Sequence, residues 1–173
     1  MILLIIALIL SLLLLSVFWS IRRLDKQYRT TRVAYLNRSM VDVWHVISDF
    51  SSYDKLGSYL KAAERLSYLS GRERWEETDY KGNIVIWETV EIFPLHRFIR
   101  RIVDEKASYS ITWAVEIREV GEVTLLSVSE EGQIDNRIMR FIAKYLSNNA
   151  VNIDRYISSV GIKLGVKVEI LDG

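Results

Sequence analysis

Cysteine is absent from this sequence of 173 residues, which contains one proline and two histidines. Without cysteine the chain has no disulfides, no thiolate nucleophiles and no thiolate metal ligands. The two histidines, His45 and His96, do not have the spacing of metal ligands, so we expect neither a metal site nor a cofactor. The sequence also contains no glycine-rich phosphate loop, no nucleophile elbow and no dinucleotide-binding fingerprint. No motif therefore assigns a reaction.

Charged side chains are missing from the first 21 residues, which are mostly Leu and Ile. At about 1.5 Å per residue, a helix of this length covers a hydrocarbon core of about 30 Å. A secretory signal peptide is the alternative, but no basic residue precedes the apolar run, the run is too long, and bulky Phe18 stands two places before the small Ser20. We therefore expect an uncleaved transmembrane helix at residues 1–21, with the lipid bilayer as a partner.

The charge changes sharply after this apolar run. Positions 22 to 32 hold five basic residues and one acid, namely Arg22, Arg23, Lys26, Arg29 and Arg32 against Asp25. Because basic flanks stay on the cytoplasmic side, they predict a single-pass membrane location with the domain on the cytoplasmic side. We interpret residues 22–30 as a basic juxtamembrane linker. The rest of the chain has 18 basic and 21 acidic residues, a balance that argues against nucleic acid as a partner.

The remaining pattern indicates one α+β domain at residues 31–162, followed by a C-terminal tail at 163–173. Ser39 and Asp42 form the signature of a capping box before an amphipathic helix. From Ser70-Gly71 to Glu131-Gly132, turn signals recur about every dozen residues and predict an antiparallel meander. From Asn136 to Val160 the apolar spacing is helical. We expect a curved antiparallel sheet wrapped around this long C-terminal helix.

Three stretches of sequence resemble one known superfamily. Residues 43–50, followed by Tyr53-Asp54-Lys55, resemble its first helix; residues 88–97 are similar to its strand, proline turn and next strand; and residues 136–141 resemble the start of its terminal helix. The superfamily is the START-like or helix-grip superfamily, also called SRPBCC, and within it the polyketide cyclase/dehydrase and lipid-transport group. The resemblance covers about residues 32–160. This chain has Leu95 where the family usually has a second proline.

The resemblance implies a cavity between the sheet and the long helix that holds a hydrophobic ligand such as a lipid, an isoprenoid or a polyketide. It carries over no catalytic residue, because the members share none. Our leading hypothesis is a membrane-anchored START-like domain that binds or transfers such a ligand. The alternatives are a cyclase or dehydratase type of enzyme that uses a cavity carboxylate, and a protein-interaction module with no open cavity. The sequence identifies no protein partner.

Aromatic and apolar side chains on the predicted strands and terminal helix are the candidate ligand contacts, although such residues are more often core than ligand contacts. The candidate set is Trp75, Tyr80, Ile86, Glu88, Val90, Tyr109, Trp113, Phe141 and Tyr145. Glu88 shares one face of its strand with apolar residues, so it could bind a polar head group or act as a general base if that face lines the cavity. Alternatively, Glu88 forms a salt bridge with Arg100 or Arg74, or the opposite face, which carries Trp87, is the inner one.

Overall fold

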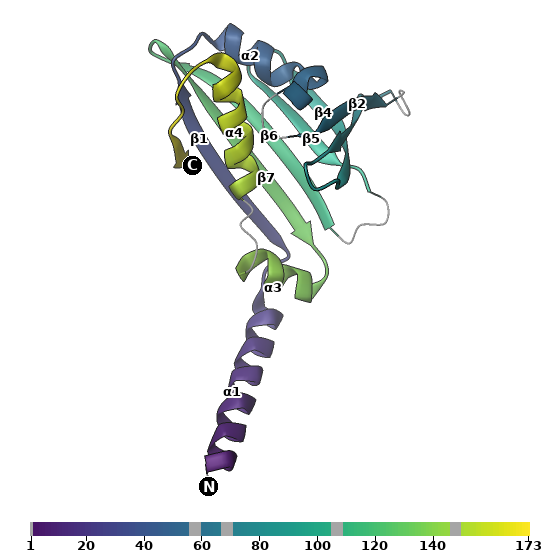
Figure 1. The fold of residues 1–173 in the computed structure, drawn as a ribbon, viewed down its shortest axis with the longest axis vertical. Helices are drawn as coiled ribbons and strands as arrows, with labels where there is room; N and C mark the ends of the chain where they lie inside the picture. The colour runs from purple at the N-terminus through teal and green to yellow at the C-terminus, as the bar shows by residue number, and fades with distance from the viewer. Residues whose placement is uncertain (1, 56–59, 67–70, 105–108, 146–149) are drawn as a thin grey trace.

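The computed structural model describes residues 2–55, 60–66, 71–104, 109–145 and 150–173, with backbone alone for some positions in the first helix and for residues 54 and 55. The structure is an α+β fold in which most strands follow one another directly along the chain (Figure 1). The elements are α1 (Ile2–Arg23), β1 (Gln27–Leu36), α2 (Met40–Ser48), the 3-10 helix η1 (Phe50–Lys55), β2 (Ala62–Leu66), β3 (Arg74–Thr78), β4 (Ile84–Phe93), β5 (Arg97–Ile102), β6 (Tyr109–Val120), β7 (Val123–Ile134), α3 (Arg137–Tyr145), α4 (Ala150–Leu164) and β8 (Ile170–Asp172).

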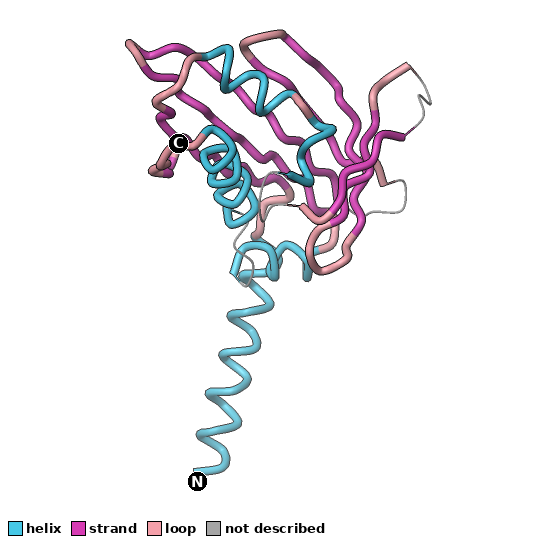
Figure 2. Tube along the Cα trace, turned by 45° about the horizontal axis from the view of Figure 1, so that its top comes forward, coloured by secondary structure: helices cyan, strands magenta, loops and turns pink. Residues whose placement is uncertain are grey.

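One antiparallel sheet joins all the described strands in the order β2-β3-β4-β5-β6-β7-β1-β8. The sheet curves, and α2 and α4 lie on the same side of it (Figure 2). The buried face of α4 carries Ile153, Tyr156, Ile157 and Val160. These side chains share one core cluster with Trp113, Val115 and Ile117 of β6. The predicted arrangement of a curved sheet around a C-terminal helix is therefore present.

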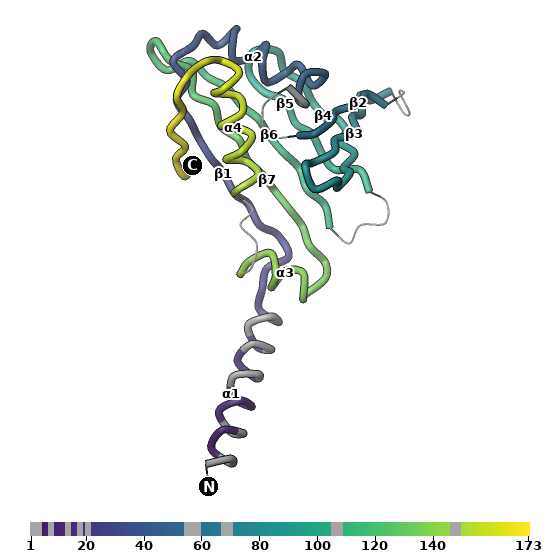
Figure 3. The backbone as a smooth tube through the Cα atoms, viewed as in Figure 1, coloured from purple at the N-terminus to yellow at the C-terminus, as the bar shows by residue number. Residues whose placement is uncertain are grey.

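The expected long terminal helix is two helices, α3 and α4. Helix α3 packs near α1 and β7, whereas α4 contacts α2, β1 and β7 (Figure 3). The apolar spacing of the sequence is helical in both segments, so periodicity alone did not reveal two elements with different partners. Of these two helices only α4 has buried residues, whereas α3 has none. The gripping helix of the fold is consequently α4.

The turn expected at Glu131-Gly132 is also wrong, because both residues lie inside β7 and pair with β1 and β6. Gly132 stands opposite Tyr28, whose ring lies directly against the glycine. A Cβ atom at position 132 would come within 2.1 Å of a carbon of that ring. Gly132 therefore allows the Tyr28 ring to lie close against the backbone of β7. Glycine inside a strand often has this role, in addition to its role in turns.

The transmembrane part of the predicted fold requires a correction. A helix that crosses the hydrocarbon core needs about 20 consecutive apolar residues. Within the described residues, no helix is long and apolar enough to cross a membrane. This finding contradicts the expected anchor at residues 1–21 and the single-pass membrane location with a cytoplasmic domain. The lipid bilayer as a partner is consequently not supported. The structure shows α1 leading into the domain at Leu24, whose carbonyl accepts a hydrogen bond of 2.7 Å from Arg140 of α3.

A candidate ligand cavity between the sheet and helix α4

A cavity of about 830 Å³ lies between the inner face of the sheet and the first turns of α4. Its apolar wall consists of Leu60, Val85, Trp87, Ile102, Ile111 and Trp113, and the rings of Tyr80 and Tyr109 add to it. Its polar groups are Glu77, Asp79, Lys81, Asn83, Glu130, Asn152 and Arg155. A cavity of this size, with aromatic walls and a few convergent polar groups, is typical of sites for small molecules.

Two tryptophans close the inner end of this cavity. The ring centroids of Trp87 and Trp113 are 5.7 Å apart, and both residues line the cavity and also a much smaller void of about 10 Å³. Tyr53, Phe98 and Tyr156 fill the space around that void. Because 10 Å³ is about the space of one water molecule, the interior beyond the tryptophans has no room for a ligand. The cavity thus occupies one end of the space between sheet and helix.

A buried ion pair lies on the sheet, and one of its members, Glu77, lines the cavity. Arg100 of β5 donates a hydrogen bond of 2.6 Å to Glu77 of β3, and both side chains are at most 5% exposed. The guanidinium of Arg100 also lies over the rings of Phe50 and Trp87, at 4.5 and 5.4 Å from their centroids. Burial raises the pKa of the Glu77 carboxyl above its usual value, and the charge of Arg100 opposes that shift. Removal of either charge would therefore leave the other one buried without its partner.

A second buried carboxylate, that of Glu130, is held by two neutral donors. Trp113 donates through Nε1 over 2.7 Å to one carboxylate oxygen, and the Tyr28 hydroxyl donates over 2.8 Å to the other. Trp113 is the direct cross-strand partner of Glu130, and Tyr28 reaches it across Gly132. Burial, together with the nearby charge of Glu130, raises the pKa of Tyr28 well above its ordinary value. Tyr28 is thus a hydrogen-bond donor throughout the physiological pH range.

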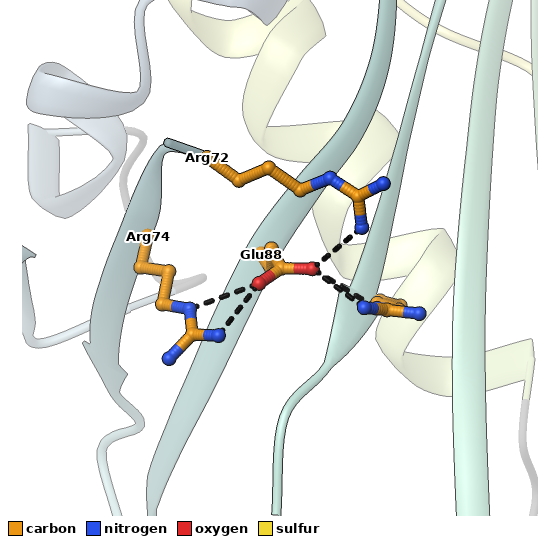
Figure 4. A network of polar contacts seen from close by, with 4 residues as sticks. Arg72, Arg74 and Glu88 are labelled. Atoms are coloured by element: carbon orange, nitrogen blue, oxygen red, sulfur yellow. Dashed lines mark hydrogen bonds and ion pairs between the residues drawn. The ribbon is translucent and has the colours of Figure 1, made fainter. Parts of the chain in front are cut away.

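Glu88 lies on the opposite face of β4, because its neighbour Trp87 faces the cavity. Its side chain is 2% exposed and accepts hydrogen bonds from Arg74 at 2.7 and 2.9 Å, from Arg101 at 2.7 and 3.2 Å, and from Arg72 at 3.2 Å (Figure 4). Burial by itself would raise the pKa of Glu88, but the hydrogen bonds from these arginines outweigh it and lower the pKa to about 2. The carboxylate of Glu88 therefore holds Arg72, Arg74 and Arg101 together on the outer face of the sheet.

Of the nine candidate ligand contacts, the structure brings three to the cavity, namely Tyr80, Tyr109 and Trp113. Trp75 packs in the core against Phe50, with ring centroids 6.2 Å apart. Ile86 and Glu88 are on the outer face of β4, and Val90 lies at the bulge between Thr89 and Glu91. Phe141 and Tyr145 stack on each other in α3, with centroids 4.9 Å apart. These six are not among the described residues that line the cavity.

The sequence interpretation did not select the two carboxylates of the cavity, Glu77 and Glu130. For Glu77 a signal was present, since it is two positions from Trp75 on a short strand and so shares its buried face. Glu130 follows Ser129 and precedes Glu131 in a polar stretch that pointed to a turn. Arg100 was considered as a partner of Glu88, but it pairs with Glu77, while Arg74 and Arg101 bind Glu88.

Neither a protein-family model nor a curated protein matches this sequence. Solved structures do resemble it. A di-domain aromatase/cyclase of the steffimycin biosynthetic pathway has a TM-score of 0.59 at 11% identity over 86% of this chain, which spans 55% of that protein. The ZhuI aromatase/cyclase from a Streptomyces species has a TM-score of 0.58 at 12% identity, covering 80% of this chain and 96% of its own.

Norcoclaurine synthase from Thalictrum flavum, solved in complex with dopamine and hydroxybenzaldehyde, has a TM-score of 0.65 at 11% identity, covering 83% of this chain and 90% of its own. Identities this low establish the fold and nothing finer. The similarity agrees with the observed order of elements, in which the sheet curves around α4 and leaves a cavity at one end. The chain therefore has the helix-grip fold that these solved structures share.

Proposed function

We propose that this protein binds a hydrophobic small molecule that contains at least one polar group, in the cavity beside α4. The observation that carries the proposal is the cavity of about 830 Å³, in which eight of the fifteen described lining residues are aromatic or aliphatic. Burial of apolar ligand surface there would contribute about 25 cal/mol per Å². The polar residues of the cavity would orient the ligand.

The structural neighbours support the same class of ligand. Two of them are aromatase/cyclases, and a third was solved with two small aromatic compounds. The closure of the interior by Trp87 and Trp113 favours a compact, partly aromatic ligand over a long-chain one, because little space continues beyond these rings. The open cavity also argues against a module that acts only through its outer surface.

A substitution that fills the cavity tests the proposal. Val85 lines the cavity, whereas its neighbour Ile84 is on the other face of β4 and is 61% exposed. We expect native mass spectrometry to detect retained small aromatic compounds after incubation of the full chain with a defined panel of such compounds. The variant Val85→Trp should retain at least tenfold less compound than the wild type, and the matched variant Ile84→Trp should retain the same amount. Equal retention by all three proteins, or no retention by the wild type, would contradict cavity binding.

A further inference from the structure

Glu130 presents an unusual electrostatic situation on the cavity surface. Its side chain is 94% buried, lines the cavity, and accepts hydrogen bonds from Trp113 and Tyr28 on its two oxygens. Both donors are neutral, so they orient the negative charge without cancelling it.

The other charges of the cavity do not neutralise Glu130. Glu77 is paired with Arg100 at 2.6 Å, which makes that pair neutral as a whole. Lys81 and Arg155 are exposed residues at the cavity rim, and Asp79 is bound within its own turn by Asn83. Across the part of the chain that the structure describes, no cation lies within 4.0 Å of the Glu130 carboxylate. A buried charge without a counter-ion is costly, and a ligand cation would remove that cost.

The walls next to Glu130 are also suited to a cation. Trp113 holds Glu130 and packs against Trp87, and the phenol rings of Tyr80 and Tyr109 line the same cavity. The faces of indole and phenol rings attract cations within about 6 Å of their centroids. An ammonium group bound at Glu130 would therefore meet a carboxylate next to the indole of Trp113, inside a cavity that further aromatic rings line.

We infer that the ligand of this cavity carries a cationic amine, which binds against the carboxylate of Glu130, next to an apolar or aromatic body. This inference rests on the proposed function, since it names the chemical class of the molecule that occupies the cavity. It gives Glu130 the role of counter-ion, Trp113 and Tyr28 the role of positioning residues, and Trp87, Tyr80 and Tyr109 the role of aromatic wall.

Three matched probes separate charge from shape: 2-(2-naphthyl)ethylamine, 2-(2-naphthyl)ethanol and 2-naphthylacetate. Their binding to the full chain at neutral pH can be measured by isothermal titration calorimetry. We expect the amine to bind at least tenfold more tightly than the alcohol, a difference of about 1.4 kcal/mol, and the carboxylate to bind most weakly. Equal binding of amine and alcohol, or preference for the carboxylate through Arg155 or Lys81, would overturn the inference and leave cavity binding intact. Failure of all three probes to bind would overturn both.

Variants at neighbouring positions supply the control. Glu130→Gln removes the charge but keeps an acceptor for Trp113, and we expect the amine to lose its advantage over the alcohol. Glu131→Gln makes the same chemical change one position along, at a side chain that is 62% exposed and paired with Arg29, and should leave the preference unchanged. Tyr28→Phe keeps the charge of Glu130 but removes one of the two donors that orient it, so the amine should still bind more tightly than the alcohol, by a smaller factor than in the wild type, and this holds even if Glu130→Gln fails to fold. Persistence of the amine preference in folded Glu130→Gln, or its loss in folded Tyr28→Phe, would contradict the counter-ion role.

Discussion

Substitution of Gly132 by alanine tests the close approach that positions Glu130. The added Cβ would stand 2.1 Å from one carbon of the Tyr28 ring and 2.5 Å from its hydroxyl oxygen. Such contacts are far inside van der Waals distance, so the ring must move. The hydrogen bond of 2.8 Å from the Tyr28 hydroxyl to Glu130 would then break.

The expected loss of stability follows from these two effects. Overpacking costs about 1 to 3 kcal/mol, and loss of a hydrogen bond to a charged group costs about 1.5 to 3 kcal/mol. Alanine restores up to about 1 kcal/mol because it restricts the unfolded chain. We expect Gly132→Ala to lower the free energy of unfolding by about 3 kcal/mol. With a urea m-value of about 2 kcal/mol/M, the midpoint would fall by about 1.5 M.

Urea unfolding followed by tryptophan fluorescence measures this change, and a double-mutant cycle assigns its cause. In a Tyr28→Ala background the ring that supplies the three atoms nearest to the added methyl group at position 132 is gone. Gly132→Ala should then be neutral or stabilise the protein by up to about 1 kcal/mol. A destabilisation of the same size in both backgrounds, or a neutral or stabilising effect in the wild type, would refute the reasoning.

Two ion clusters provide further tests. The pKa of Glu88 is lowered to about 2 in the folded protein, so its ion pairs stabilise the fold above the unfolded pKa of about 4.3, and this contribution is lost as the pH falls from about 4.5 to 2. Glu88→Gln should lower stability at pH 7 by about 2 kcal/mol and reduce the acid dependence of urea midpoints; an unchanged pH profile would contradict the assignment. Arg100→Met leaves Glu77 buried and unpaired, so it should lower the free energy of unfolding by about 3 to 5 kcal/mol. Adding Glu77→Gln to this variant should recover part of that loss. If the effects of the two substitutions simply add in the double mutant, the two charges are independent and the assignment is wrong.

Local sequence patterns predicted the strands well where the two faces differ in polarity. In residues 109–118, Trp113, Val115 and Ile117 face the core and Glu116 and Arg118 face solvent, as their alternation indicates. The N-cap at Ser39 is also present, since its hydroxyl accepts a hydrogen bond from the Asp42 amide. These features depend on neighbouring residues, so they can be recognised in a linear sequence.

The orientation of β4 could not be predicted in this way. Ile84 to Phe93 is apolar on both faces, so alternation left open whether Trp87 or Glu88 points inward. The answer depends on the neighbouring strands, which place Arg74 and Arg101 directly opposite Glu88 on the outer face, while Trp87 lies against the cavity. The register of the sheet, and not the polarity of the strand, decides this position.

Periodicity and composition were thus sufficient to derive an α+β chain with a curved sheet and a C-terminal helix that grips it. The site required contacts between residues far apart in the chain. Tyr28, Trp113 and Glu130 meet only because β1, β7 and β6 are adjacent and because Gly132 lets a ring pass. A sequence pattern records the preferences of each segment separately, whereas a binding cavity depends on which segments become neighbours.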